Sequence, residues 1–226
     1  MANQDESPPT IPQLQVRESY LQALLGGDRK EALQIVELAV SEGFEPIDVY
    51  LEVLEPAMHE VGALWENSTI SVAQEHLATA ITQYVMAHCY RRFSQAGAPP
   101  RKGPLILTGV AGELHEIGPR MVGDFLELQG WKVSFLGSNN PTTEVLRLLR
   151  ERSPLALGVS VTMAWNLEEA AGLIQDIRGE FRFPVFVGGG AFRTDTGAWS
   201  AVGADAWGRD AADALRAVES VLEKNE

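Results

Sequence analysis

The sequence predicts a helical bundle of four helices followed by a doubly wound α/β domain with a five-stranded parallel sheet. Apolar residues recur at helical spacing through the first part of the 226-residue chain. A Gly- and Pro-rich stretch, SQAGAPPRKGP, then interrupts this pattern. Beyond it, short apolar runs alternate with amphipathic segments, as in parallel sheets covered on both faces. We therefore expect a disordered tail over 1–12, the bundle over 13–94, a linker over 95–103 and the sheet domain over 104–226.

Start and stop signals delimit the four helices of the first part. Asp28 with Glu31, and Ser71 with Gln74, have the spacing of capping boxes at helix N-termini. Pro56 falls inside the third apolar pattern, where it should kink or split the helix. The expected helices are 13–25, 28–43, 46–64 and 71–93.

The second part reads as five strands alternating with helices. The strands are continuous apolar runs, and the connecting segments have apolar residues at helical spacing. Ligands of such sheets bind beyond the carboxyl ends of the strands. Three loops fall there: AGELHEIG, TMAWN and GGGAFRT. The expected strands are PLILTGV, KVSFLG, PLALGVSV, PVFVGG and ADAWG, with helices over 119–129, 142–150 and 167–178 and from 210 onward.

Composition excludes several classes of function. A formal net charge of −13 disfavours direct binding to nucleic acid. The longest runs without a charged residue, 76–90 and 153–167, are too short to span a bilayer. The first residues, MANQDESPPT, lack the features of a signal peptide, and Cys89 is the single cysteine. We expect a cytoplasmic protein without membrane contact.

His115, in the loop after the first strand, is the main candidate for chemistry. Glu113 stands two residues before it, placed to fix the tautomer of a metal-ligating imidazole. An ordinary surface-loop histidine is the alternative. A metal held by protein alone needs three or four ligands, whereas the chain has four histidines and no histidine pair at ligand spacing. A metal at His115 would therefore have to arrive largely coordinated by a cofactor. The sequence lacks G-x-S-x-G, and no G-x-G-x-x-G follows the first strand.

Three patterns in order, E-L-H-E-I-G, S-V-T and G-G, make the second part resemble the cobalamin-binding domain, which has a Rossmann- or flavodoxin-like fold. The resemblance implies that His115 replaces the dimethylbenzimidazole of cobalamin as the lower axial ligand to cobalt. The displaced nucleotide tail would pass Ser160, Thr162 and the turn at Gly188. Glu113 departs from the family, which usually has Asp there. The implied contacts are Glu113, His115, Glu116, Ile117, Gly118, Ser160, Thr162, Gly188, Gly189 and Gly190.

The helical part contains the pattern W-x9-E-H, formed by Trp65, Glu75 and His76. Each of these residues also has a simpler interpretation: a core aromatic, a helix N-terminal acid and a surface histidine. Together, ahead of a cobalamin domain, they resemble the light-sensing bundle of B12-dependent photoreceptors of the CarH and LitR type. The resemblance implies that Trp65, Val72, Glu75 and His76 surround the adenosyl group of adenosylcobalamin.

The implied function is a light sensor rather than an enzyme. Light would break the Co–C bond, and the two domains would shift and signal to an unidentified protein partner, with a homo-oligomer expected. Two departures from the family stand out: no N-terminal DNA-binding domain is seen, and Glu66 replaces the histidine that can take the upper cobalt site. A further resemblance, to photocobilins, implies a bilin such as biliverdin. Its candidate contacts, each of which also fits a core or surface position, are Tyr84, Met86, His88, Trp165 and Arg193.

One other function remains open, and a third class is disfavoured. Corrinoid methyl carriers, which pass methyl groups between methyltransferases, resemble this chain in both parts. An adenosylcobalamin mutase subunit would need a separate catalytic barrel.

Overall fold

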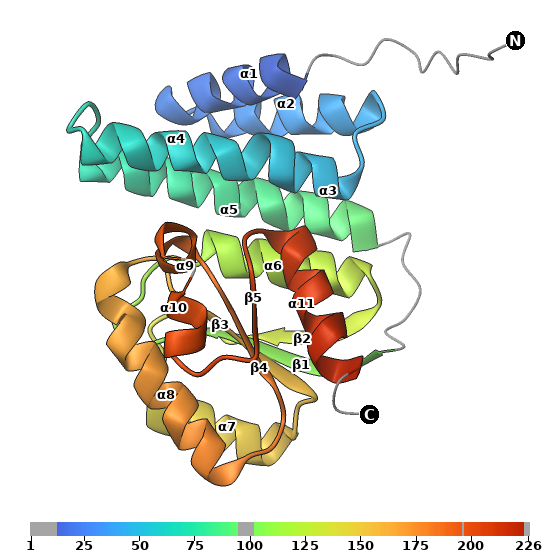
Figure 1. The fold of residues 1–226 in the computed structure, drawn as a ribbon. Helices are drawn as coiled ribbons and strands as arrows, with labels where there is room; N and C mark the ends of the chain where they lie inside the picture. The colour runs from blue at the N-terminus through green and yellow to red at the C-terminus, as the bar shows by residue number, and fades with distance from the viewer. Residues whose placement is uncertain (1–12, 95–101, 196, 224–226) are drawn as a thin grey trace, which may run out of the picture. The chain divides into compact units, whose positions relative to one another are not determined.

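The computed structural model describes residues 13–94, 102–195 and 197–223, and the chain divides into two compact units, residues 1–95 and 96–226 (Figure 1). The tail expected over 1–12 lies outside the described residues, as does most of the expected linker. No helix in the described ranges is long and apolar enough to cross a membrane.

The first unit is helical, as predicted. Both capping boxes form hydrogen bonds: Glu31 N donates to Asp28 Oδ1 at 2.9 Å, whereas Ser71 and Gln74 bond each other reciprocally. These contacts satisfy backbone N–H groups that the first turn of a helix leaves without partners. The elements are α1 (Gln13–Leu25), α2 (Arg29–Ser41), α3 (Pro46–Asp48), the π-helical segment η1 (Val49–Leu54), α4 (Glu55–Glu66) and α5 (Val72–Ser94).

A kink or a split of the third helix was predicted at Pro56, and the structure shows no split there. The chain is neither split nor terminated there; it passes from α3 through η1 into α4. Pro56 stands in the first turn of α4, where a missing N–H removes no hydrogen bond within that helix. The wider π turns, in which Glu55 N donates to Tyr50 O, accommodate the proline without a break between α3 and α4.

A buried polar contact links three helices of this unit. Tyr20 on α1 donates from its hydroxyl to Thr82 Oγ1 on α5 at 3.0 Å, and Thr82 donates to Met58 Sδ on α4 at 3.2 Å. Tyr20 and Thr82 are both fully buried, and burial raises the pKa of Tyr20. The hydroxyl groups are therefore satisfied within the core rather than by water.

The second unit confirms the predicted doubly wound sheet. Five parallel strands lie in the order β2-β1-β3-β4-β5. Helices α6 and α11 cover one face, and α7 and α8 cover the other (Figure 1). The elements are β1 (Lys102–Gly109), α6 (Ile117–Leu128), β2 (Trp131–Phe135), α7 (Thr142–Arg152), β3 (Ala156–Ser160), η2 (Ala164–Asn166), α8 (Leu167–Glu180), β4 (Val185–Gly188), α9 (Gly190–Thr194), α10 (Ala198–Ala201), β5 (Ala206–Gly208) and α11 (Ala211–Glu223).

The apolar run of β1 shows why these strands are continuous in hydrophobicity. Leu105 and Leu107 pack against α6 and α11, whereas Ile106 packs into the core on the opposite face. Successive side chains of a strand point to opposite faces, and both faces are buried here. The sheet therefore needs apolar residues at consecutive positions.

The strand order fixes where loops converge. β1 is flanked by β2 on one side and β3 on the other, and Gly109 of β1 pairs with Ser160 of β3. The loops that follow β1 and β3 thus leave the sheet side by side at its carboxyl edge, at a topological switch point. All three predicted loops are partly helical: AGELHEIG ends in the first residues of α6, TMAWN includes η2, and GGGAFRT includes α9.

Candidate functional site

His115 lies in the loop between β1 and α6, at the carboxyl edge of the sheet. Its side chain is 52% exposed. The ring Nδ1 donates a hydrogen bond to Glu113 Oε1, and the backbone N of His115 donates to the same oxygen at 3.1 Å. The ring orientation is therefore set by one carboxylate oxygen through two contacts.

The other oxygen of Glu113 reaches a different loop. Its Oε2 accepts from Thr162 N at 2.7 Å, from Met163 N at 3.3 Å and from Asn166 Nδ2 at 3.2 Å. Glu113 itself is fully buried. The carboxylate therefore joins the loop after β1 to the loop after β3. This link was not predicted from the sequence.

These contacts keep Glu113 ionised. Burial alone would raise its pKa, but the hydrogen bonds from His115, Thr162 and Asn166 together lower that pKa to about 2. An ionised carboxylate favours the tautomer with hydrogen on Nδ1, which leaves the lone pair on His115 Nε2. That is the nitrogen a metal would require.

The loop after β2 braces the same segment from the other side. Ser138 Oγ donates to His115 O at 2.9 Å, and Ser138 N donates to Glu116 Oε1 at 3.1 Å. Gly112 N, at a positive φ of 79°, donates to Asn139 Oδ1 at 2.9 Å. Sequence reasoning missed Ser138 and Asn139, although the polar run Ser-Asn-Asn shortly after β2 was an available signal.

The glycines after β4 lie against the loop after β3. A Cβ added at Gly189 would stand 2.3 Å from the Val161 carbonyl oxygen, and one at Gly190 would stand 3.0 Å from Thr162 O. Glycine is therefore required for this close backbone approach, since a Cβ would fill the space. Ser160, at the end of β3, is 8% exposed. The contacts of these residues with a cofactor tail remain predictions.

In the helical unit, the predicted residues flank the turn between α4 and α5. Trp65 is 43% exposed and Val72 is 52% exposed, so Trp65 is not the core aromatic of the simpler interpretation. Glu75 accepts a hydrogen bond from Thr79 Oγ1 at 2.9 Å, and His76 Nε2 lies 3.6 Å from Glu75 Oε2. Two exposed apolar side chains therefore lie on either side of one short turn.

The residues suggested for a bilin are divided between the two units: Tyr84, Met86 and His88 lie in the first, and Trp165 and Arg193 lie in the second. Met86 is fully buried in the helical core, and the Tyr84 and His88 rings contact each other in a tilted arrangement, with centroids 4.2 Å apart and planes at 48°. Arg193 donates to Arg209 O, whereas Trp165 is 73% exposed. Bilin binding through these residues remains a prediction.

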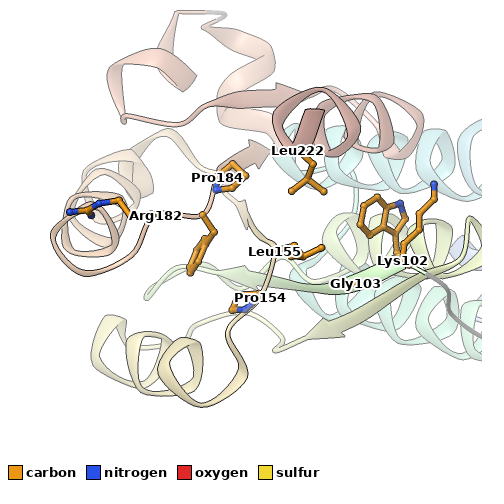
Figure 2. A pocket seen from close by; sticks show the side chains of 9 residues that line it. Lys102, Gly103, Pro154, Leu155, Arg182, Pro184 and Leu222 are labelled. Carbon is orange, nitrogen blue, oxygen red and sulfur yellow. The ribbon is translucent and has the colours of Figure 1, made fainter. Parts of the chain in front are cut away.

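A cavity of about 500 Å³ lies at the opposite, amino edge of the sheet (Figure 2). Leu155, directly before β3, and Leu222, on α11, both point into this cavity. None of the residues predicted for the site lines it. The candidate cofactor site is therefore the set of braced loops at the carboxyl edge, and this cavity is separate from it. The lining residues are Lys102, Gly103, Trp131, Pro154, Leu155, Arg182, Phe183, Pro184 and Leu222.

Two segments of the chain match family models. Residues 16–90 match a B12 binding domain model, and residues 103–216, about half of the chain, match a second model of the same description. The chain belongs to the B12 binding domain family. Cobalamin is thus the ligand class of this protein.

Among curated relatives of this B12 binding domain protein is the HTH-type transcriptional repressor CarH of Myxococcus xanthus. It is 31% identical over 184 residues, which cover 79% of this chain and 58% of the repressor. The methanol–corrinoid protein of Methanosarcina barkeri is 23% identical over 203 residues, 88% of this chain and 76% of that protein. A solved structure, the monomethylamine corrinoid protein of Methanosarcina barkeri, has the same fold, with a TM-score of 0.78 at 19% identity over 94% of this chain and 99% of that one.

Proposed function

We propose that the protein holds an alkylated cobalamin with His115 as the lower axial ligand and carries a methyl group within a methyl-transfer system. The coupling of His115 Nδ1 to the buried, ionised Glu113 is the observation that supports axial ligation. A bound alkylcobalamin supplies a cobalt–carbon bond that a partner enzyme or light can cleave.

The donor set fits this group. An imidazole with its hydrogen on Nδ1 presents Nε2 to the metal, and a half-exposed ring at a sheet edge is accessible to a large planar ligand. The carboxylate raises the basicity of the imidazole by accepting its hydrogen bond. His115 can therefore fill one open coordination position of a metal, and the cobalt of a corrinoid would offer such a position.

Similarity over most of the chain supports the carrier role. The match to the methanol–corrinoid protein extends through both units, and the corrinoid protein fold covers nearly the whole chain. In this role the chain binds and presents the methyl group, while methyltransferases perform the transfer. The protein is then a component of an enzyme system rather than an enzyme by itself.

A second candidate function is an adenosylcobalamin light sensor. The exposed Trp65 and Val72 on either side of the α4–α5 turn favour it, because they offer apolar surface to a group as large as adenosyl. The identity to CarH, higher than that to the methanol–corrinoid protein, points the same way. In this role an adenosyl group, light-sensitive through its cobalt–carbon bond, would be bound in the dark.

One experiment separates the two functions. The full chain is loaded in the dark with methylcobalamin or with adenosylcobalamin, and affinity, visible spectrum and mass in solution are measured before and after green light. A carrier binds methylcobalamin at least as tightly as adenosylcobalamin, and its mass does not change on illumination. Preferential binding of adenosylcobalamin with a light-dependent change in mass would replace the carrier proposal by the sensor.

A further inference from the structure

Asn166 is a buried amide at the carboxyl edge of the sheet that the sequence motifs do not include. It ends the short η2 turn, directly before α8, and is 7% exposed. Its backbone N donates to Met163 O at 2.9 Å, and this contact holds the loop after β3 in a tight turn. Its side chain donates from Nδ2 to Glu113 Oε2 at 3.2 Å, across 53 positions of sequence.

The same side chain also lies against the loop that precedes His115. A Cβ added at Gly112 would stand 3.3 Å from Asn166 Oδ1, so the amide packs against the backbone there. Asn166 therefore contacts the His115 loop at two points, Gly112 and the Glu113 carboxylate. Such an amide has little freedom to turn, since it is buried and held from both sides.

The two oxygens of Glu113 divide between two loops. Oε1 accepts from the backbone and ring of His115, whereas Oε2 accepts from Thr162, Met163 and Asn166. A shorter Asp side chain would place its carboxylate about one methylene, roughly 1.5 Å, nearer the backbone of its own loop. The longer side chain thus lets one carboxylate serve both loops.

We propose that Asn166 is a positioning residue for His115, acting through Glu113, and that it fixes the imidazole before any cofactor binds. This inference rests on the proposed ligation by His115 only for its effect on cobalamin affinity. Without the Asn166 amide, Oε2 keeps the two backbone donors but loses the side-chain donor that limits rotation of the carboxylate. The His115 ring then samples more orientations, because its Nδ1 partner is less fixed.

The test begins with the cofactor-free full chain. In ¹⁵N NMR of the histidine rings, His115 should show hydrogen on Nδ1 in the wild type. Asn166→Ala should shift the His115 ring signals toward a mixture of tautomers. The matched control is Gln175→Ala, another amide on the exposed face of α8, which should leave these signals unchanged. Unchanged His115 signals in a folded Asn166→Ala protein would overturn the proposal.

A second variant covers the case in which Asn166→Ala does not fold. Asn166→Leu has nearly the same size but no N–H donor, so Glu113 Oε2 loses its side-chain partner without a cavity and the His115 signals should shift as in Asn166→Ala. Circular dichroism checks that each variant is folded. Wild-type signals in the folded Asn166→Leu protein would equally contradict the role of Asn166.

Cobalamin binding provides a test through a double-mutant cycle. Asn166→Ala should weaken binding by about 10-fold, the lower end of the effect of such orienting groups. In a Glu113→Gln background it should add little, because it acts through that carboxylate. Fully additive effects would mean that Asn166 acts elsewhere. If His115→Ala binds cobalamin with the wild-type spectrum, the ligation proposal fails, while the NMR result still decides the role of Asn166.

Discussion

The two predicted cofactor regions of this chain are built in different ways. The His115 loop is braced by hydrogen bonds from the loops after β2 and β3, and its acidic partner Glu113 is fully buried. The α4–α5 turn of the helical unit instead exposes Trp65 and Val72, and Glu75 is bonded to its own helix through Thr79. Prior ordering reduces the entropy lost on binding, so a braced region suits a permanent ligand. The exposed apolar region has fewer such contacts, so binding there would cost more ordering entropy.

The largest expected effect comes from the braced region. His115→Ala removes the proposed axial ligand, so the histidine-ligated absorption spectrum should disappear and affinity should fall by more than about 100-fold, beyond the effect of losing an orienting group. Visible spectroscopy and equilibrium titration with methylcobalamin measure both. His76→Ala, in the exposed region, is the control and should keep the spectrum. A wild-type spectrum in His115→Ala would show that the His115 loop does not ligate the cofactor.

The second largest expected effect is that of acid, which protonates Glu113 and should lower the free energy of unfolding. The folded pKa of Glu113, about 2, lies below its ordinary value of 4.5, so ionised Glu113 stabilises the fold above about pH 4.5. That contribution, on the order of 3 kcal/mol, is lost as pH falls toward 2. Urea unfolding of the wild type and of Glu113→Gln should therefore differ most near pH 7, and the difference should narrow toward pH 3. An equal difference at both pH values would show that ionisation of Glu113 does not stabilise the fold.

The same substitution should have a smaller effect on cofactor affinity than the loss of His115. Glu113→Gln keeps a neutral acceptor for the imidazole but loses the charge, so affinity should fall by about 10-fold or somewhat more. The histidine-ligated spectrum should persist at saturating methylcobalamin. Glu116→Gln, in which an amide oxygen can still accept from Ser138 N, is the comparison and should change affinity less. A loss as large as that of His115→Ala would mean that Glu113 does more than orient the ring.

The exposed region should give the smallest effect, but a selective one. Trp65→Ala should lower the free energy of unfolding by less than the roughly 3–5 kcal/mol that truncation of a fully buried aromatic costs, because Trp65 is 43% exposed. It should lower affinity for adenosylcobalamin by a few-fold, on the order of 1 kcal/mol, relative to methylcobalamin if the exposed indole contacts the larger group. Titration with both cobalamins measures the ratio. An unchanged ratio would remove the observation that favours the sensor.

Several features could be predicted because they depend on neighbours in sequence. The capping box at Ser71 and Gln74 spans one helical turn, and the central strand β3 shows its burial as a continuous apolar run. The pairing of Glu113 with His115 is equally local, two residues apart. The π-helical turns before Pro56 were not predicted, because the sequence shows the proline but not the hydrogen-bond register around it.

The sequence by itself determined the two-part organisation, the doubly wound sheet and the choice of His115, since periodicity, turn residues and short motifs are encoded over a few positions. Only the tertiary structure decided what surrounds that histidine. Asn166 stands 53 positions from Glu113, and Ser138 stands 23 from His115. Strand order brings these loops to one edge of the sheet, and no local pattern records which side chains meet there. Burial of Glu113 and exposure of Trp65 were decided in the same way, because both follow from how the elements pack.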